Sequence, residues 1–251
     1  MRNVPWRFFL GALVVLGFWE GACHAGWISQ IILPPPSGIF LAAVNDGSVF
    51  LKAFAVTLFE VTVSIVIAWT LGVVSGLIAG SAPVVSIAIG SVLSSLFAIP
   101  LVILYPVFMA WVGIGSSSKI LFGVMSGYFP IALNTLNGMQ AVETRYVTMA
   151  RAMGASRLQL YARVLFPLAV PSIVSGLRIG TGLIVIGVIV AEMLASRDGI
   201  GFLITYHRTL FDTSDVYLGF IFAISMAIGI NLGLSALERR FSQFSAPAND
   251  A

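Results

Sequence analysis

Long apolar runs, separated by short polar segments, dominate the pattern of residues along this chain. Each run approaches the roughly 20 residues that a helix needs to cross the hydrocarbon core of a bilayer. The runs are continuous and do not alternate with polar residues, which favours helices over the strands of a membrane barrel. We therefore predict an all-α integral membrane protein whose single domain fills residues 1–251. Its six spans are expected at about 8–27, 53–79, 85–112, 120–139, 168–194 and 216–237.

One polar segment, residues 140–167, is far longer than a connection between two spans requires. Apolar residues recur in it with the i, i+3, i+4, i+7 spacing of a helix face, which predicts two short amphipathic helices. The expected apolar face of the first helix consists of Tyr146, Met149, Ala150 and Met153. The expected apolar face of the second consists of Leu158, Tyr161, Ala162 and Leu165.

Local signals mark the ends of these two helices. Gly154 can adopt the left-handed conformation that ends a helix. Ser156, with Gln159 three residues later, is a capping-box start for the second helix. Pro167 either closes the second helix or begins the next span. The expected unit is therefore a helix, a glycine break and a second helix.

Four arginines lie off the predicted apolar faces of this segment: Arg145, Arg151, Arg157 and Arg163. There they could pair with acidic groups of a partner protein, because short amphipathic helices commonly dock in a partner's groove. The alternative is a helix that lies flat on the bilayer with its arginines at the lipid headgroups. The residues alone leave both interpretations open.

Composition agrees with a membrane protein. Hydrophobic residues make up 59% of the 251 residues and charged residues 9%, against about a quarter charged in a typical soluble domain. Six spans leave no room for a separate soluble domain. The net charge of +3 is small, and we expect no nucleic-acid partner. A single cysteine, Cys23, excludes an internal disulfide and a cysteine metal cluster.

The positions of the basic residues predict the orientation, because short cytoplasmic loops are enriched in Lys and Arg. With six spans, both termini and the 140–167 segment share one side. Basic residues on that side are Arg2, Arg7, Arg145, Arg151, Arg157, Arg163, Arg239 and Arg240. Those on the other side are Lys52, Lys119, Arg197 and Arg208. We therefore expect cytoplasmic termini, a cytoplasmic 140–167 segment, and outward-facing loops at 28–52 and 195–215.

The first apolar run has a rival interpretation as a cleaved signal peptide. The small residues Ala22 and Ala25 fit such a peptide loosely, but Trp19 and Glu20 precede any suitable cleavage point. We expect an uncleaved span.

Small residues predict where spans pack closely. Glycines repeat every four residues at Gly72, Gly76 and Gly80, and again at Gly176 and Gly180. This spacing lets two helix backbones approach each other in lipid. We expect packing within the chain, with a contact between subunits as the less favoured alternative.

The chain has no motif for ATP hydrolysis. A phosphate-binding loop requires Gly-x-x-x-x-Gly-Lys followed by Ser or Thr. The two lysines are Lys52 and Lys119, and the serines before Lys119 leave no glycine next to it. We expect no catalytic residues and no cofactor bound by this chain.

The polar segment resembles the EAA loop of permeases from ABC importers. That pattern is Glu-Ala-Ala, three residues, Gly, nine residues, Ile, one residue, Leu-Pro, and three of its positions coincide with Ala150, Gly154 and Pro167. Thr148 stands where the pattern has Glu, which is the main departure. The resemblance implies that the segment couples the permease to an ATPase. The coupling positions are Thr148, Met149, Ala150, Arg151, Met153, Gly154, Ala155, Ser156, Arg157 and Pro167.

The resemblance covers almost the whole chain. The stretches 32–36, 176–178, 191–194 and 199–201 resemble permeases that import nitrate, taurine, aliphatic sulfonates or pyrimidine precursors. It implies a type I importer fold in a bacterial inner membrane and a permease dimer made of two copies. The expected partners are two cytoplasmic ATPase subunits, which use ATP and Mg²⁺, and an extracytoplasmic substrate-binding protein. The expected substrate is a small organic anion such as a sulfonate or carboxylate, or nitrate, with a pyrimidine precursor as the second choice.

Charged and kinking residues inside the spans are further candidates, because such residues usually face the protein interior or water. Glu60, Pro100 and Glu192 could line the pathway or a gate. Glu60 departs from the family, in which an arginine is expected. Arg178 is expected to have a structural role near the cytoplasmic end of its span. His207 lies in an outward loop with no ligand set beside it, so no metal site is expected.

A second class of function stays open at this point. A stand-alone carrier or channel driven by ions would need several buried acids or a polar half-helix site near the midplane. The few intramembrane charges and the docking design of residues 140–167 favour the importer permease.

Overall fold

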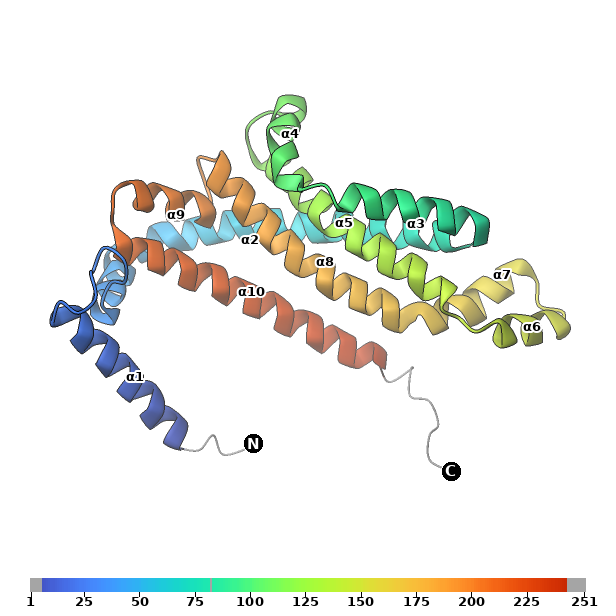
Figure 1. Cartoon of the computed structure of the whole chain (residues 1–251), viewed down its shortest axis with the longest axis horizontal. Helices are drawn as coiled ribbons and strands as arrows, with labels where there is room; N and C mark the ends of the chain where they lie inside the picture. Colours follow the sequence, from blue (N-terminus) through green and yellow to red (C-terminus); the bar gives the residue numbers. More distant parts are fainter. Residues whose placement is uncertain (1–5, 82, 243–251) are drawn as a thin grey trace. The chain divides into compact units, whose positions relative to one another are not determined.

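The computed structural model describes residues 6–81 and 83–242. Within these residues all regular secondary structure is helical, as predicted (Figure 1). The elements in chain order are α1 Trp6–His24, α2 Pro36–Gly80, α3 Pro83–Phe97, the 3-10 helix η1 Leu101–Leu104, α4 Tyr105–Val112, α5 Ser116–Gln140, α6 Thr144–Ala152, α7 Arg157–Leu160, the π-helix η2 Tyr161–Leu165, α8 Phe166–Leu194, α9 Ile200–Thr209 and α10 Thr213–Ser242.

Four helical stretches in the described part are long and apolar enough to cross a membrane: Pro36–Gly80, Ser116–Gln140, Arg157–Leu194 and Thr213–Ala236. A fifth is obtained if the bent pair Val85–Phe97 and Leu101–Val112 is counted as one span. The first predicted span corresponds to a shorter apolar helix, Leu10–His24. The exact number of six spans therefore stays a prediction.

Helix α2 is much longer than its predicted span at 53–79. It begins at Pro36, so most of the loop expected at 28–52 is helical. The stretch Asn45-Asp46-Gly47-Ser48 has turn composition, yet it is helical and lies between Ala42 and Phe50, which both belong to a buried cluster. Helix propensity is a weak preference that such packing routinely overrides.

The predicted third span is broken. Helix α3 ends at Phe97, and the two parts of the span meet at 76°. Pro100 lies at the break, where it precedes η1 in an extended conformation. Pro106 lies at the start of α4, a position that tolerates proline because the first N–H groups of a helix have no internal partner. Of these two prolines, only Pro100 lies at the bend.

The chain divides into two compact units, and the first comprises Met1–Thr57 and Glu192–Ser225. The core of this unit is formed by the start of α2, by α9 and by the start of α10. The buried residues of this core are Ile39, Ala42, Phe50, Ala53, Ile200, Leu203, Ile204 and Leu218. The loop expected at 195–215 thus contains a helix, α9, whose apolar face covers α2.

The second unit comprises Leu58–Ala191 and Met226–Ala251. Its glycines bring α2 close to α5. A Cβ atom on Gly72 would lie 2.7 Å from Cγ2 of Ile131, and one on Gly76 would lie 2.6 Å from Cβ of Thr135. Gly80 meets Met139 in the same way. Contacts advance four residues along both helices together, so α2 and α5 run parallel here.

Helix α8 also packs closely against α5. A Cβ atom on Gly180 would lie 2.5 Å from Cγ1 of Ile131 and 2.9 Å from the carbonyl oxygen of Gly127. Gly138, near the other end of α5, meets Ser172. The numbering rises along one helix as it falls along the other, so α8 and α5 are antiparallel. The predicted packing of both glycine series within the chain is confirmed.

Part of the charge-based orientation rests on residues near the termini. Arg2 lies outside the described residues, as do the side chains of Arg7, Arg239 and Arg240. The orientation of the termini therefore stays a prediction.

The two neighbouring glycines of α8 allow a matched test of the packing. We expect Gly180→Ala to destabilise the protein by about 1–3 kcal/mol, the usual cost of overpacking. We expect Gly182→Ala to be neutral or stabilising, since its Cβ would meet nothing within 4 Å and alanine favours a helix over glycine. Thermal unfolding of the full-length protein in detergent measures both. Equal midpoints for the two variants would contradict the close approach.

Candidate functional site

The segment between α5 and α8 has the predicted break. Helix α6 ends at Ala152, and Gly154 follows with a φ of +78°. The backbone N–H of Ala155 donates to the carbonyl of Ala150 at 3.0 Å, and that of Gly154 donates to Arg151 at 2.9 Å. These bonds satisfy carbonyls that the end of a helix leaves free. The left-handed glycine predicted from the sequence is confirmed.

The capping box is confirmed as well. The backbone N–H of Gln159 donates to Oγ of Ser156 at 3.3 Å, and the N–H of Ser156 donates to Oε1 of Gln159 at 2.9 Å. Helix α7 starts here and continues through η2 into α8 without a break. Of the two roles considered for Pro167, the structure shows the second: it lies in the first turn of α8.

The π-helix η2 changes which residues face inward. Leu160 and Leu165 are both buried, five residues apart, whereas Leu158 is 78% exposed. The predicted face of Leu158, Tyr161, Ala162 and Leu165 assumed the repeat of an α-helix. It is wrong because a π-turn closes its hydrogen bonds over five residues and so rotates the face.

Helix α6 has apolar side chains on two sides. Val147 and Ala150 pack, with the preceding Val142, against a buried cluster around Met139 and Leu165. The remaining residues of the predicted face point outward: Tyr146 is 39%, Met149 61% and Met153 85% exposed. The predicted face is thus divided. One side attaches α6 to its own chain, and the other leaves large apolar side chains uncovered.

The same segment also exposes its four arginines. Arg145 pairs with Glu143 at 2.6 Å and lies over the ring of Tyr146 at 4.9 Å. Arg151, Arg157 and Arg163 are exposed, and no ion pair is formed by them within the described ranges. Thr148, which stands where the family pattern has Glu, is exposed on α6. The exposed side chains of the segment therefore include both large apolar residues and arginines.

Two hydrogen bonds between side chains and distant elements hold the segment to its unit. Tyr161 donates its hydroxyl hydrogen to the carbonyl of Ser81, at the end of α2, and Gln140 donates to the hydroxyl of Ser86 in α3. Helices α6 and α7 lie beyond the ends of α5 and α8 (Figure 1). A movement of the segment would therefore act on several helices of this unit.

Glu60, a predicted gate residue, forms an ion pair inside the second unit. Its Oε1 lies 2.6 Å from Nζ of Lys119, and both side chains are at most 3% exposed. Helix α5 contributes the lysine, which the sequence had placed in an outward-facing connection. Both charged groups can be buried because the ammonium and the carboxylate compensate each other's charge. The sequence signal for this pair was a lysine at the edge of one apolar run, Lys119, and a single acid, Glu60, within another.

Glu192, the second predicted gate residue, caps a helix of the first unit. Its carboxylate accepts hydrogen bonds from Oγ1 of Thr57 and from the backbone N–H of Gly201, both at 2.8 Å. A Cβ atom on Gly199, which has a φ of +104°, would lie 1.9 Å from Oε1 of Glu192. The carboxylate thus occupies the start of α9, where a negative charge is favourable. A role of Glu60, Glu192 or Pro100 in the pathway or a gate stays a prediction.

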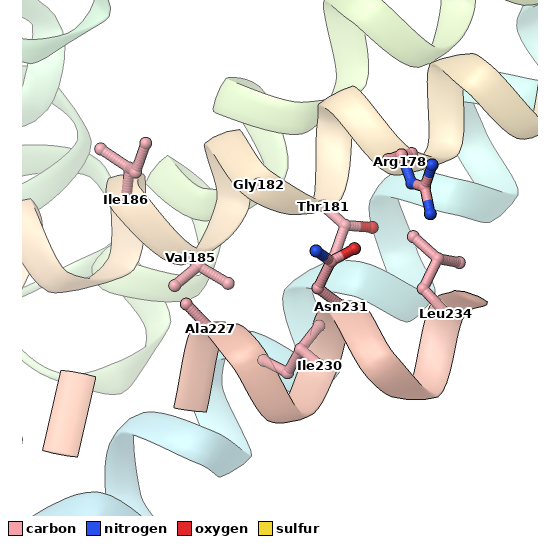
Figure 2. Close-up of a pocket in the computed structure, with 9 residues that line it drawn as sticks. All are labelled: Arg178, Thr181, Gly182, Val185, Ile186, Ala227, Ile230, Asn231 and Leu234. Atoms are coloured by element: carbon pink, nitrogen blue, oxygen red, sulfur yellow. The ribbon is translucent and has the colours of Figure 1, made fainter. Parts of the chain in front are cut away.

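A pocket of about 530 Å³ lies between α8 and the last part of α10 (Figure 2). Most of its lining is apolar, but Thr181 and Asn231 face each other across it, and Arg178 lies one turn along α8. Arg178 donates to Oγ of Ser235 at 2.8 Å, and Trp69 donates to Oγ1 of Thr181 at 3.0 Å. The sequence analysis missed Thr181 and Asn231. An amide in a long apolar run was the signal that could have identified Asn231.

Comparisons with known proteins agree on one family. A family model described as "Binding-protein-dependent transport system inner membrane component" matches residues 70–244. The chain is 28% identical to the taurine transport system permease protein TauC of Escherichia coli, over 96% of this chain and 94% of the relative. It is 32% identical to the formylaminopyrimidine transport permease protein ThiX of Halalkalibacterium halodurans, over 94% of this chain and 92% of the relative.

A solved structure has the same fold. A chain of the MetNI methionine ABC transporter, in an inward-facing conformation, superposes with a TM-score of 0.65 at 20% identity. The match covers 77% of this chain and 96% of that chain. The predicted fold class, an all-helical type I importer fold, is confirmed.

The buried pair gives a prediction with an internal control. Lys119→Met should destabilise the protein by about 3–5 kcal/mol, because it leaves the carboxylate of Glu60 buried and uncompensated. The exchange Glu60→Lys with Lys119→Glu should recover much of this loss. Lys52→Met, which removes an exposed lysine, should change the unfolding midpoint little. The pair is unimportant if Lys119→Met and Lys52→Met unfold at the same temperature.

Proposed function

The chain belongs to the family of inner-membrane components of binding-protein-dependent transport systems, and on this premise we propose how it works as the permease subunit of an ABC importer. The segment 140–167 docks on a cytoplasmic ATPase. Closure of the ATPase around ATP and Mg²⁺ moves the segment, and the spans alternate between inward and outward access as rigid bodies. The observation that carries this proposal is the exposed apolar side of α6.

Exposure of Met149, Met153 and Leu158 supports docking on a protein. Large side chains that stay uncovered in a cluster usually mark an interaction surface. Methionine suits such a surface because it is flexible and adapts to the shape of a groove. The charged surroundings, with Arg151 and Arg157 exposed, suit the polar rim of an interface.

Further partners follow from the family. The chain lacks a phosphate-binding loop, so we propose that two ATPase subunits act with two copies of this permease. An extracytoplasmic binding protein delivers the substrate to the face opposite the docking segment. The predicted orientation, with cytoplasmic termini and a cytoplasmic 140–167 segment, belongs to the same proposal.

We propose a small organic anion, such as a sulfonate or carboxylate, or nitrate as the substrate. The names of TauC and ThiX connect relatives with taurine and with a formylaminopyrimidine. Within this chain, the pocket between α8 and α10 combines the guanidinium of Arg178 with the polar groups of Thr181 and Asn231. Guanidinium groups bind carboxylates and similar anions through paired hydrogen bonds.

Docking predicts a loss of coupling without a loss of folding. Met153→Asp should reduce substrate-stimulated ATP hydrolysis of the reconstituted importer at least about tenfold, since a buried uncompensated carboxylate costs several kcal/mol at an interface. Thr144→Asp introduces the same charge at the start of α6, where it is tolerated, and should retain hydrolysis. Both are measured as phosphate release in liposomes.

A second variant removes the break itself. Gly154→Pro cannot adopt the φ of +78° found at this position and should also uncouple hydrolysis from substrate. If ATP hydrolysis stays normally coupled to substrate in both Met153→Asp and Gly154→Pro, the docking proposal is contradicted. A helix that lies on the bilayer would then be favoured.

Transport of an anion through this pocket should depend on the positive charge of Arg178. Arg178→Gln should slow uptake of an anionic substrate about tenfold or more, whereas Arg178→Lys should retain part of it, because the charge persists but the forked hydrogen bonds do not. Ser235→Ala, which removes the hydroxyl partner and keeps the charge, should transport normally. If Arg178→Gln and Ser235→Ala lower uptake equally, the arginine has only a structural role.

A further inference from the structure

The turn between α9 and α10 brings three metal-ligating side chains together. His207, Asp212 and Asp215 each offer a ligand atom, and these atoms all lie within 4.8 Å of one another. The sequence analysis expected no ligand set beside His207, so the finding differs from that expectation. All three residues belong to the first unit.

The local backbone explains the convergence. Helix α9 ends at Thr209, and Phe211 adopts a φ of +59°, which reverses the chain at once. The N–H of Asp212 then donates to the carbonyl of His207 at 3.0 Å. Stacking on Phe50, with ring centroids 5.9 Å apart, holds the imidazole in place. The turn thus positions Asp212, and stacking on Phe50 positions the imidazole of His207.

Two buried polar atoms of the cluster have no hydrogen-bond partner among the described residues. Asp215 is 5% exposed, and its buried Oδ1 has no hydrogen-bond partner there. The same holds for buried Nδ1 of His207, which lies 3.7 Å from Oδ2 of Asp212, beyond hydrogen-bonding distance. Unpaired buried polar atoms are costly and call for an explanation.

Negative charge accumulates around Asp215. A carboxylate oxygen of Asp212 and one of Asp215 lie within 4.8 Å of each other, so the two negative charges repel. A bound cation would relieve this repulsion and would satisfy the free oxygen and the free nitrogen together. A proton shared between the two carboxylates is the competing explanation, but it would leave Nδ1 of His207 without a partner.

We propose that His207, Asp212 and Asp215 bind a divalent transition-metal ion, with Zn²⁺ as the best probe. One imidazole nitrogen and two carboxylates suit Zn²⁺, which takes ligands at about 2.0–2.2 Å, so the side chains close slightly around it. Ca²⁺ suits the cluster poorly because it requires six to eight oxygen ligands. Asp212 is exposed and provides the entry path, with water completing the coordination. The ion joins the end of α9 to the start of α10.

Direct binding tests the site. The full-length protein, purified in detergent without a polyhistidine tag, is dialysed to equilibrium against Zn²⁺, and bound metal is measured per chain. We expect a single site, unaffected by excess Ca²⁺. His207→Gln and Asp212→Asn should each weaken binding by no less than the roughly tenfold that loss of an outer-shell partner costs. Zn²⁺ should also raise the thermal midpoint of the wild type but not of His207→Gln.

The other histidine provides the matched control. His24 pairs with Glu20 at 2.8 Å in α1, and His24→Gln should bind Zn²⁺ as the wild type does. The proposal is overturned if the wild type binds no stoichiometric Zn²⁺, or if His207→Gln binds it as tightly as His24→Gln. Asp212 is exposed, so its substitution tests the site even if variants at the buried Asp215 fail to fold.

Discussion

Direct contact between helix backbones is the constraint on which the second unit depends. Lipid chains are as apolar as leucine, so helices in a membrane gain little from hiding hydrocarbon and depend on close packing. Helix α5 receives α2 on one side through Gly72 and Gly76 and α8 on another through Gly180. No larger side chain fits at these places without displacing a neighbour. The buried Glu60–Lys119 pair joins α2 and α5 at another point of the same two helices, and the 140–167 segment connects α5 to α8.

The 140–167 segment is attached firmly on one side and uncovered on the other. Its inner residues share a buried cluster with α5 and α8, and its outer residues keep large apolar side chains in the open. A segment held on both sides could not receive a partner, and one held on neither could not transmit its movement. This division of a short helix into two apolar sides supports the coupling role that we propose for the segment.

Local rules predicted much of the segment, because the features concerned depend on neighbours in sequence. The left-handed Gly154 and the Ser156–Gln159 capping box require only residues a few positions apart, and both are present. Features that depend on distant contacts were not predictable in this way. The burial of Lys119 needs a specific acid on another helix, and the early start of α2 needs the apolar cover supplied by α9. The convergence at His207 needed a single residue with positive φ, Phe211, that carries no glycine signal.

The π-helix η2 determines the rotational phase between the two ends of one continuous rod. Each residue of an α-helix advances the side chains by about 100° around the axis. The wide turn at Tyr161–Leu165 therefore sets which way the side chains of α7 face when the glycines of α8 face α5. A chain of the same composition with a regular α-helical turn there would present its methionines and Leu158 to a different direction. The fit of the proposed docking surface to an ATPase subunit would thus depend on the angle of α7 as well as on the side chains that it exposes.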